Sequence, residues 1–321
     1  MAFIDFYNFM FYLSTFSFTR NYVVGRITLF FILLLSRPIL RSKNKHVKND
    51  FKKKKSSREL LKDLINNVLQ DLDVVKHFIN IKPEDVISIL KEDGLTPLHI
   101  AASIGSEDIC NYLLQNGADV NARNREGVTP LTYALNLKIA RILIQNGANV
   151  NVQDNDGWTA LHEAAYYNLH EIAKVLLENG AEINATSKEG TTLLHLSAQE
   201  GNFEVSKVLI QYCANVGAQD KDLITPLHFS VLNGHKEIAT HLIQNGANVN
   251  ALTEKGHSPL NGAVQINCIE IAQLLIKHGA DTTHPLLFSV HKQFYQMVKL
   301  LVEHGANVNT KCPNDWTPLR Y

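Results

Sequence analysis

The chain has 321 residues, 45% of them hydrophobic, with 17 glycines and 9 prolines, so it can bury a sizeable core and is not a disordered or collagen-like polymer. Its 31 basic and 31 acidic residues balance overall, but residues from 59 onward hold 19 basic against 29 acidic residues, which argues against nucleic-acid binding by that part. Four cysteines without a C-x-x-C pair exclude a disulfide scaffold, a zinc ribbon and a redox dithiol.

Residues 1–40 form a hydrophobic N-terminal segment that contains eight of the 14 phenylalanines. Its longest uncharged runs, 6–19 and 27–36, are shorter than the roughly 20 apolar residues that a spanning helix needs. If Arg26 is tolerated, residues 21–36 make a marginal membrane span. The basic run after this span then predicts that the rest of the chain lies on the cytoplasmic side. The alternatives are a segment without a folded role and an export signal, although residues 36–38 offer no small-x-small cleavage site.

Residues 41–57 form a basic linker, because residues 41–58 hold nine Lys or Arg and only one acidic residue, Asp50. The cluster Lys52 to Lys55 fits a solvated linker beside a membrane, or else a nuclear-targeting or acidic-lipid signal. Residues 58–90 contain three helix-like stretches and are predicted to form a helical N-terminal cap, since the terminal units of a solenoid are atypical. We expect a cytoplasmic protein that residues 1–40 tether to a membrane.

Self-similarity dominates the rest of the chain. The dipeptide Gly-Ala recurs mostly every 30 or 33 residues, with Cys213-Ala214 in the same phase; its glycines are Gly117, Gly147, Gly180, Gly246, Gly279 and Gly305. A second series has the same period, with Leu223 in one glycine position; its glycines are Gly94, Gly127, Gly157, Gly190 and Gly256.

Each period predicts a turn, two short helices and an extended return, as residues 220–252 illustrate. Thr225 is placed to cap a helix that accepts Pro226 in its first turn. Asn233-Gly234 ends that helix, and residues 236–244 carry apolar side chains at helical spacing. Gly246 then ends the second helix in a left-handed conformation. Neither helix can bury its apolar face alone, so stacked units are expected.

The stretches GLTPLHIAA from Gly94, GWTALHEAA from Gly157 and ITPLHFSV from Ile224 resemble the ankyrin repeat family. The resemblance covers residues 91–321 and implies about seven repeats with a partial eighth. The fold class that it implies is all-α, an ankyrin-repeat solenoid of helix-turn-helix units with short β-hairpin turns. It also gives a structural role, a hydrogen bond that fixes each turn, to the Thr and His of the motif: Thr96, His99, Thr159, His162, Thr192, His195, Thr225 and His228.

Three departures from this pattern stand out. The second unit is three residues short between Gly127 and Gly147, and it lacks the usual loop between its helices. About seven residues of turn are missing between Gly279 and Pro285, so we expect no hairpin there. The sequence ends at Tyr321 inside an eighth unit, which predicts either a makeshift cap or a truncated reading frame.

No catalytic constellation is found, since the phosphate-binding loop, the dinucleotide fingerprint, H-E-x-x-H and G-x-S-x-G are all absent from the sequence. Only about 57 residues precede the helical units, too few for the usual catalytic domain. We therefore expect neither an enzyme nor a cofactor nor a metal site.

Binding remains as the function. In ankyrin proteins the turn tips and the concave face of the first helices usually hold the partner, so the resemblance predicts a protein-interaction module or scaffold. The predicted contact residues are the tip residues Arg125, Asn155, Lys188, Lys221 and Glu254 and the aromatic residues Tyr133, Trp158, Tyr166 and Tyr167. The bland alternative is that Trp158 packs on its own turn and Tyr167 fills space between helices. The alternative function is a non-catalytic regulatory or targeting subunit of an enzyme complex.

Overall fold

The computed structural model describes residues 94–309, all within the second of two compact units of the chain, Asp93–Tyr321. Over this range the secondary structure is helical and no strand is assigned. The helices come in stacked pairs, which confirms the predicted all-α solenoid. The predicted segments 1–40, 41–57 and 58–90 and the partial eighth unit from residue 310 lie outside the described residues.

We number the units along the chain by their helices. Six units have a first and a second helix, and unit 2 has a second helix only. They are unit 1, α6 (Pro97–Ile104) and α7 (Glu107–Gln115); unit 2, α8 (Leu137–Gln145); unit 3, α9 (Ala160–Tyr166) and α10 (His170–Glu178); unit 4, α11 (Leu193–Glu200) and α12 (Phe203–Gln211); unit 5, α13 (Pro226–Leu232) and α14 (Lys236–Gln244); unit 6, α15 (Pro259–Gln265) and α16 (Ile269–Lys277); and unit 7, α17 (Pro285–His291) and α18 (Tyr295–Glu303).

The first helices begin at the T-P-L-H motif. Thr96 and Thr225 are N-cap residues with extended backbone, and the proline that follows each lies in the first turn, where its missing N–H costs no intrahelical bond. Thr159 and Thr192 cap α9 and α11 in the same way. Gly201 ends α11 in a left-handed conformation, at a φ of 78°.

The second helices are amphipathic. In α10, Ile172, Ala173 and Leu176 are buried, whereas Glu171 and Lys174 are exposed. These helices end at the repeating glycine, which has a φ of 84° at Gly180. In unit 4 Cys213 occupies this position and adopts the same left-handed conformation, at a φ of 62°. A side chain carries a steric cost there that glycine avoids.

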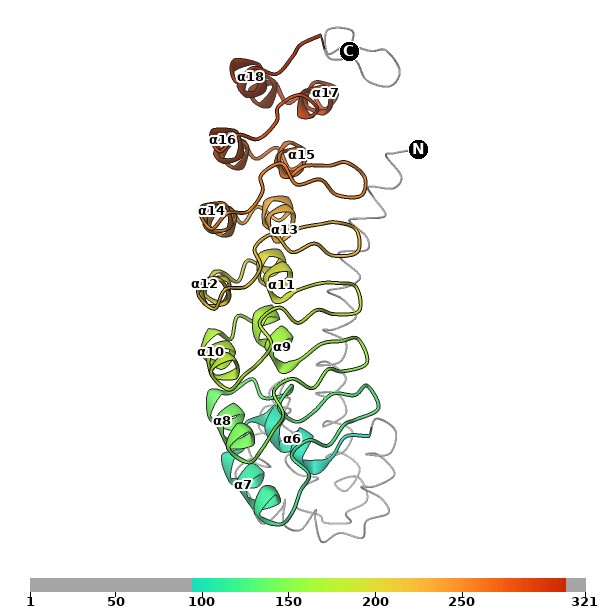
Figure 1. Ribbon diagram of the computed structural model, residues 1–321, viewed down its shortest axis with the longest axis vertical. Helices are drawn as coiled ribbons and strands as arrows, with labels where there is room; N and C mark the ends of the chain where they lie inside the picture. Colours follow the sequence, from blue (N-terminus) through green and yellow to red (C-terminus); the bar gives the residue numbers. More distant parts are fainter. Residues whose placement is uncertain (1–93, 310–321) are drawn as a thin grey trace, which may run out of the picture. The chain divides into compact units, whose positions relative to one another are not determined.

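The units stack through two rows of helices. Neighbouring first helices pack side by side from α9 to α17, and the second helices from α7 to α18 form a parallel row. The first helices lie between the second helices and the hairpins (Figure 1). The motif leucines of consecutive units fill the space between helices and are at most 3% exposed; they are Leu98, Leu131, Leu161, Leu194, Leu227 and Leu260. Truncating such a leucine to alanine costs about 2–5 kcal/mol, so this repeated position contributes much of the core.

Hairpin turns connect each second helix to the next first helix in most units. In three tips the N–H of Asn124, Asp154 or Asp220 donates to the carbonyl four residues later, at 2.8–3.0 Å. The side chain of the same residue accepts the amide N–H at that later position, at 2.8 Å in each tip. Among the described residues only an isolated bridge, Thr186 to Thr192, has β-pairing. The predicted short β-hairpins are therefore closed turns without a strand ladder.

Two departures predicted from the sequence change the structure locally. In unit 2, which is three residues short, residues 130–133 form a turn in place of a first helix. Between Ala280 and Pro285 the chain enters α17 directly, without a hairpin (Figure 1). The row of tips thus ends at residues 253–257 within the described part of the chain.

Candidate functional site

The four Thr–His pairs of the motif are hydrogen-bonded. The distance from threonine Oγ1 to histidine Nδ1 is 2.8 Å for Thr96–His99 and Thr192–His195 and 2.9 Å for Thr159–His162 and Thr225–His228. The threonine backbone N–H also donates to Nδ1, at 3.1–3.2 Å. Because Nδ1 accepts these bonds, the proton of the neutral imidazole lies on Nε2.

The other imidazole nitrogen joins one unit to the next. Nε2 of His99, His195 and His228 lies 2.9–3.1 Å from a carbonyl oxygen of the following hairpin. Burial lowers the pKa of His195 and His228 to about 4 and also lowers the pKa of His99. These rings are neutral at physiological pH, as an acceptor Nδ1 and a donor Nε2 require. Their geometry is that of structural residues.

Asparagines form a second link between units, which the sequence analysis did not identify. Asn151 Nδ2 donates to the Gly180 carbonyl at 2.9 Å, and its Oδ1 accepts from the Glu182 N–H at 2.9 Å. Asn121 and Asn250 make the same pair of bonds to their following units. The signal in the sequence is an asparagine four residues after the repeating glycine, as in Gly117 to Asn121.

This asparagine ladder is broken at two places. Gly217 occupies the asparagine position after unit 4 and has no side chain to bond the next unit. After unit 6 the position holds Thr283, whose hydroxyl turns back to Asp281 Oδ1. Units 4 and 5, and units 6 and 7, are therefore joined without this link.

The five tip residues predicted to contact a partner all lie on the surface. Arg125, Asn155, Lys188, Lys221 and Glu254 are exposed. The backbone beneath them is continuous across units, because each of the last four donates its N–H to a carbonyl of the preceding tip at 2.8–3.1 Å. Side chains of varied charge thus project from a row of fixed backbone. Their contact with a partner stays a prediction.

The predicted aromatic residues divide into one buried and three half-buried side chains. The expectation that Trp158 is directed to the surface is wrong, because Trp158 is 1% exposed. It packs against His162, with ring centroids 5.6 Å apart, and against Tyr166, at 6.1 Å. Both ring contacts lie within unit 3, so Trp158 packs inside its own unit.

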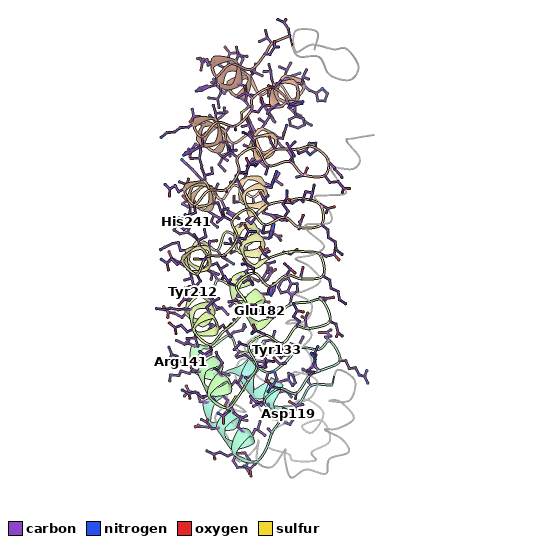
Figure 2. All side chains as sticks on the ribbon, viewed as in Figure 1. Asp119, Tyr133, Arg141, Glu182, Tyr212 and His241 are labelled. Atoms are coloured by element: carbon purple, nitrogen blue, oxygen red, sulfur yellow. The ribbon has the colours of Figure 1, made fainter. Side chains whose placement is uncertain are left out.

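The three tyrosines lie partly at the surface. Tyr166 and Tyr167 meet edge to face, with centroids 5.0 Å apart. Tyr133 packs edge-on against His99 at 5.9 Å, in the turn that replaces the first helix of unit 2. Figure 2 shows Tyr133 on the side of the inner helices and hairpins, away from Arg141 on the outer row. Tyr133 thus belongs to the inner side of unit 2, one unit before the pair in unit 3.

Within residues 94–309 no three His, Cys, Asp or Glu side chains are grouped so that they could hold a metal ion. No helix of the same residues has the length and apolar character needed to cross a bilayer.

Family comparisons agree with this geometry. A family model described as ankyrin repeats (3 copies) matches residues 64–154, 136–220 and 194–285, and a single ankyrin repeat model matches residues 283–313. The matches together span well over half of the chain.

Curated relatives share only short stretches with the chain. An ankyrin repeat-containing protein of Schizosaccharomyces pombe, P1E11.10, is 43% identical over 49 residues, which are 15% of this chain and 24% of the relative. Human Rabankyrin-5 is 52% identical over 44 residues, 14% of this chain and 4% of the relative. Rat diacylglycerol kinase zeta is 33% identical over 58 residues, 18% of this chain and 6% of the relative. The chain thus spans less than a quarter of the length of these relatives.

Proposed function

The chain belongs to the ankyrin repeat family, and we propose that it binds a partner protein through its turn tips and the inner face of its first helices. Ankyrin repeats indicate a protein-interaction module, and the family is in general a non-catalytic fold. The observation that carries the finer proposal is the row of tips, in which five exposed side chains stand on backbone that is hydrogen-bonded from unit to unit. The backbone of such a surface loses little conformational entropy when it binds.

The division between structural and variable positions supports the same assignment. The motif threonines and histidines are hydrogen-bonded, and the motif leucines are buried in the core, so the fold requires these residues. The five tip side chains are exposed, and the bond of Asn155 Nδ2 to the Arg125 carbonyl at 2.8 Å stays within the row of tips. The fold therefore constrains the tip positions less than the motif positions. The tips alternate charges, as in the ion pair of Lys221 with Glu189 at 3.5 Å, and therefore favour a partner with a mixed polar surface.

The test is quantitative capture of partner proteins by the full chain. One variant changes the five tip residues to serine, and a matched control changes the exposed outer-helix residues Arg141, Lys174 and Glu237 to serine. We expect proteins that the unchanged chain and the control capture equally and that the tip variant loses. Capture that survives the tip variant but not the control would place the interface on the outer helices and refute the proposal. A catalytic chain among the captured proteins at equal stoichiometry would favour the regulatory or targeting role.

A further inference from the structure

The inner face built by the first helices carries acidic charge without basic charge. Along α6, α9, α11, α13, α15 and α17 the acidic residues are Glu163 and Glu200, and these described helices contain no Lys or Arg. The whole chain from residue 59 onward is acidic as well, with 29 acidic against 19 basic residues. The field at this face therefore attracts cationic groups of a partner.

An aromatic pair lies beside one of these carboxylates. Tyr167 at the end of α9 and Glu200 at the end of α11 are equivalent positions in neighbouring units, 33 residues apart, and both are half-buried. Asn202 Nδ2 donates to the Tyr166 carbonyl at 2.7 Å and to the Ala165 carbonyl at 2.9 Å, which ties the ends of the two helices together. α9 and α11 are neighbours in the row of first helices, so Tyr167 and Glu200 belong to adjacent helices, and packed helices lie about 8–10 Å apart.

The buried ring of Trp158 supports the tyrosine pair. Buried Trp158 contacts the ring of Tyr166, and Tyr166 contacts the ring of Tyr167. An aromatic side chain that is supported in this way presents its surface to a ligand with little loss of rotamer freedom.

A bound cation would stabilise the charged form of the Glu200 carboxyl group. Burial raises the pKa of Glu200, and the bond from Gln199 Nε2 to its Oε1 at 3.1 Å and the nearby His235 act in the opposite direction. A planar guanidinium suits both neighbours, because one arginine can stack on an aromatic ring and donate two parallel hydrogen bonds to a carboxylate. A lysine ammonium matches the charge but not the plane.

We propose that an arginine side chain of the partner protein docks between Tyr167 and Glu200 on the inner face of units 3 and 4. This inference rests on the proposed function and names the chemistry of the partner at one point of the surface. The docked guanidinium lies over the ring of Tyr167 and bonds the carboxylate of Glu200.

The test uses a short fluorescein-labelled peptide in which arginine alternates with glycine and serine, and fluorescence anisotropy with the full chain. Matched peptides carry citrulline, which keeps the shape of arginine without its charge, or lysine. The protein variants are Tyr167→Leu, Glu200→Gln and, as a control for a surface carboxylate, Glu178→Gln at the exposed end of α10. Circular dichroism checks that each variant keeps its helical content.

We expect the arginine peptide to bind, and the citrulline peptide or the Glu200→Gln variant to weaken binding about tenfold or more, as losing a charge-assisted bond does. Tyr167→Leu and the lysine peptide should each weaken binding severalfold, and Glu178→Gln should leave it unchanged. Absence of binding, equal binding of citrulline, or equal losses for Glu178→Gln and Glu200→Gln would overturn the inference.

The outcome is separable from that of the proposed function. If captured partners are lost with the tip variant but retained by Tyr167→Leu and Glu200→Gln, the interaction module stands and the arginine site does not. If no variant changes capture, the proposed function itself fails.

Discussion

Acidification from pH 7 to pH 5 should weaken the fold through its buried histidines. The pKa of His195 and His228 is lowered from 6.5 to about 4 by burial, so at pH 5 both are protonated in the unfolded chain and neutral in the folded one. The unfolded state then binds more protons, and stability that is complete above pH 6.5 is lost as the pH falls toward 4. With these values each histidine contributes a loss of about 2 kcal/mol between pH 7 and pH 5.

Two carboxyls work in the opposite direction, because burial raises the pKa of Glu200 as well as that of Asp220. Burial raises the pKa of Asp220 from 3.8 to about 6, so the folded state takes up this proton first and gains stability on acidification. The side chain is partly exposed, and after allowance for solvent its contribution is less than about 1 kcal/mol. The loss from the two histidines exceeds the gain from the carboxyls. We therefore expect a net decrease of about 3 kcal/mol in the free energy of unfolding, measured by urea titration at both pH values.

The chain supplies its own control for this prediction. In unit 6 Asn261 replaces the motif histidine, and its Oδ1 accepts from the Ser258 N–H and hydroxyl, both at 2.9 Å. His228→Asn should therefore keep the cap but lose the bond to the His257 carbonyl, which costs about 1 kcal/mol at pH 7. It should also remove about 2 kcal/mol of the loss at pH 5. An unchanged pH dependence in this variant would show that the acid sensitivity lies elsewhere.

Three further predictions concern Gly217, Cys213 and residues 1–40. Gly217→Asn should restore the missing rung of the asparagine ladder and raise the free energy of unfolding by about 1 kcal/mol in urea titration, whereas Asn151→Gly should lower it by a similar amount. Cys213→Gly should raise the midpoint of thermal unfolding, because the left-handed conformation costs a cysteine about 1 kcal/mol that glycine avoids. A lower midpoint would contradict this reasoning. Because residues 1–40 are expected to tether the protein to a membrane, their deletion should move it from the membrane to the soluble fraction after cell fractionation. An unchanged distribution would argue against the tether.

The repeat pattern predicts most of the fold because each motif residue has a local task. Thr225 caps a helix, Pro226 fits its first turn and Gly246 ends the second helix, and each task depends only on nearby backbone. The absent hairpin before Pro285 follows from the same counting. The missing first helix of unit 2 did not follow, because a loss of three residues can shorten a loop or a helix, and the choice depends on packing.

The candidate site was less predictable, for a reason that Trp158 illustrates. Its variable position after the turn glycine suggests a surface residue, but its ring packs against His162 and Tyr166 of the same unit and is 1% exposed, whereas His257 at the equivalent position is exposed. The asparagine ladder was missed for the opposite reason: Asn151 looks like an exposed polar loop residue, yet its bonds reach the next unit. The asparagine bonds join two units, which a pattern within one unit does not contain, and the burial of Trp158 depends on side-chain packing that its repeat position alone does not fix.

Stability of the stack and recognition by it should be separable along the chain. The surface proposed for arginine lies on units 3 and 4, whose helix ends are joined by Asn202 and whose tips are joined by the Lys188 N–H. The missing rung at Gly217 lies between units 4 and 5 and touches neither Tyr167 nor Glu200. Because substitutions without shared partners add independently, Gly217→Asn should raise the free energy of unfolding and leave the affinity for the arginine peptide unchanged. If the affinity rises with the stability, the inner face of unit 4 is not preorganised in the unbound chain, and the ladder takes part in recognition.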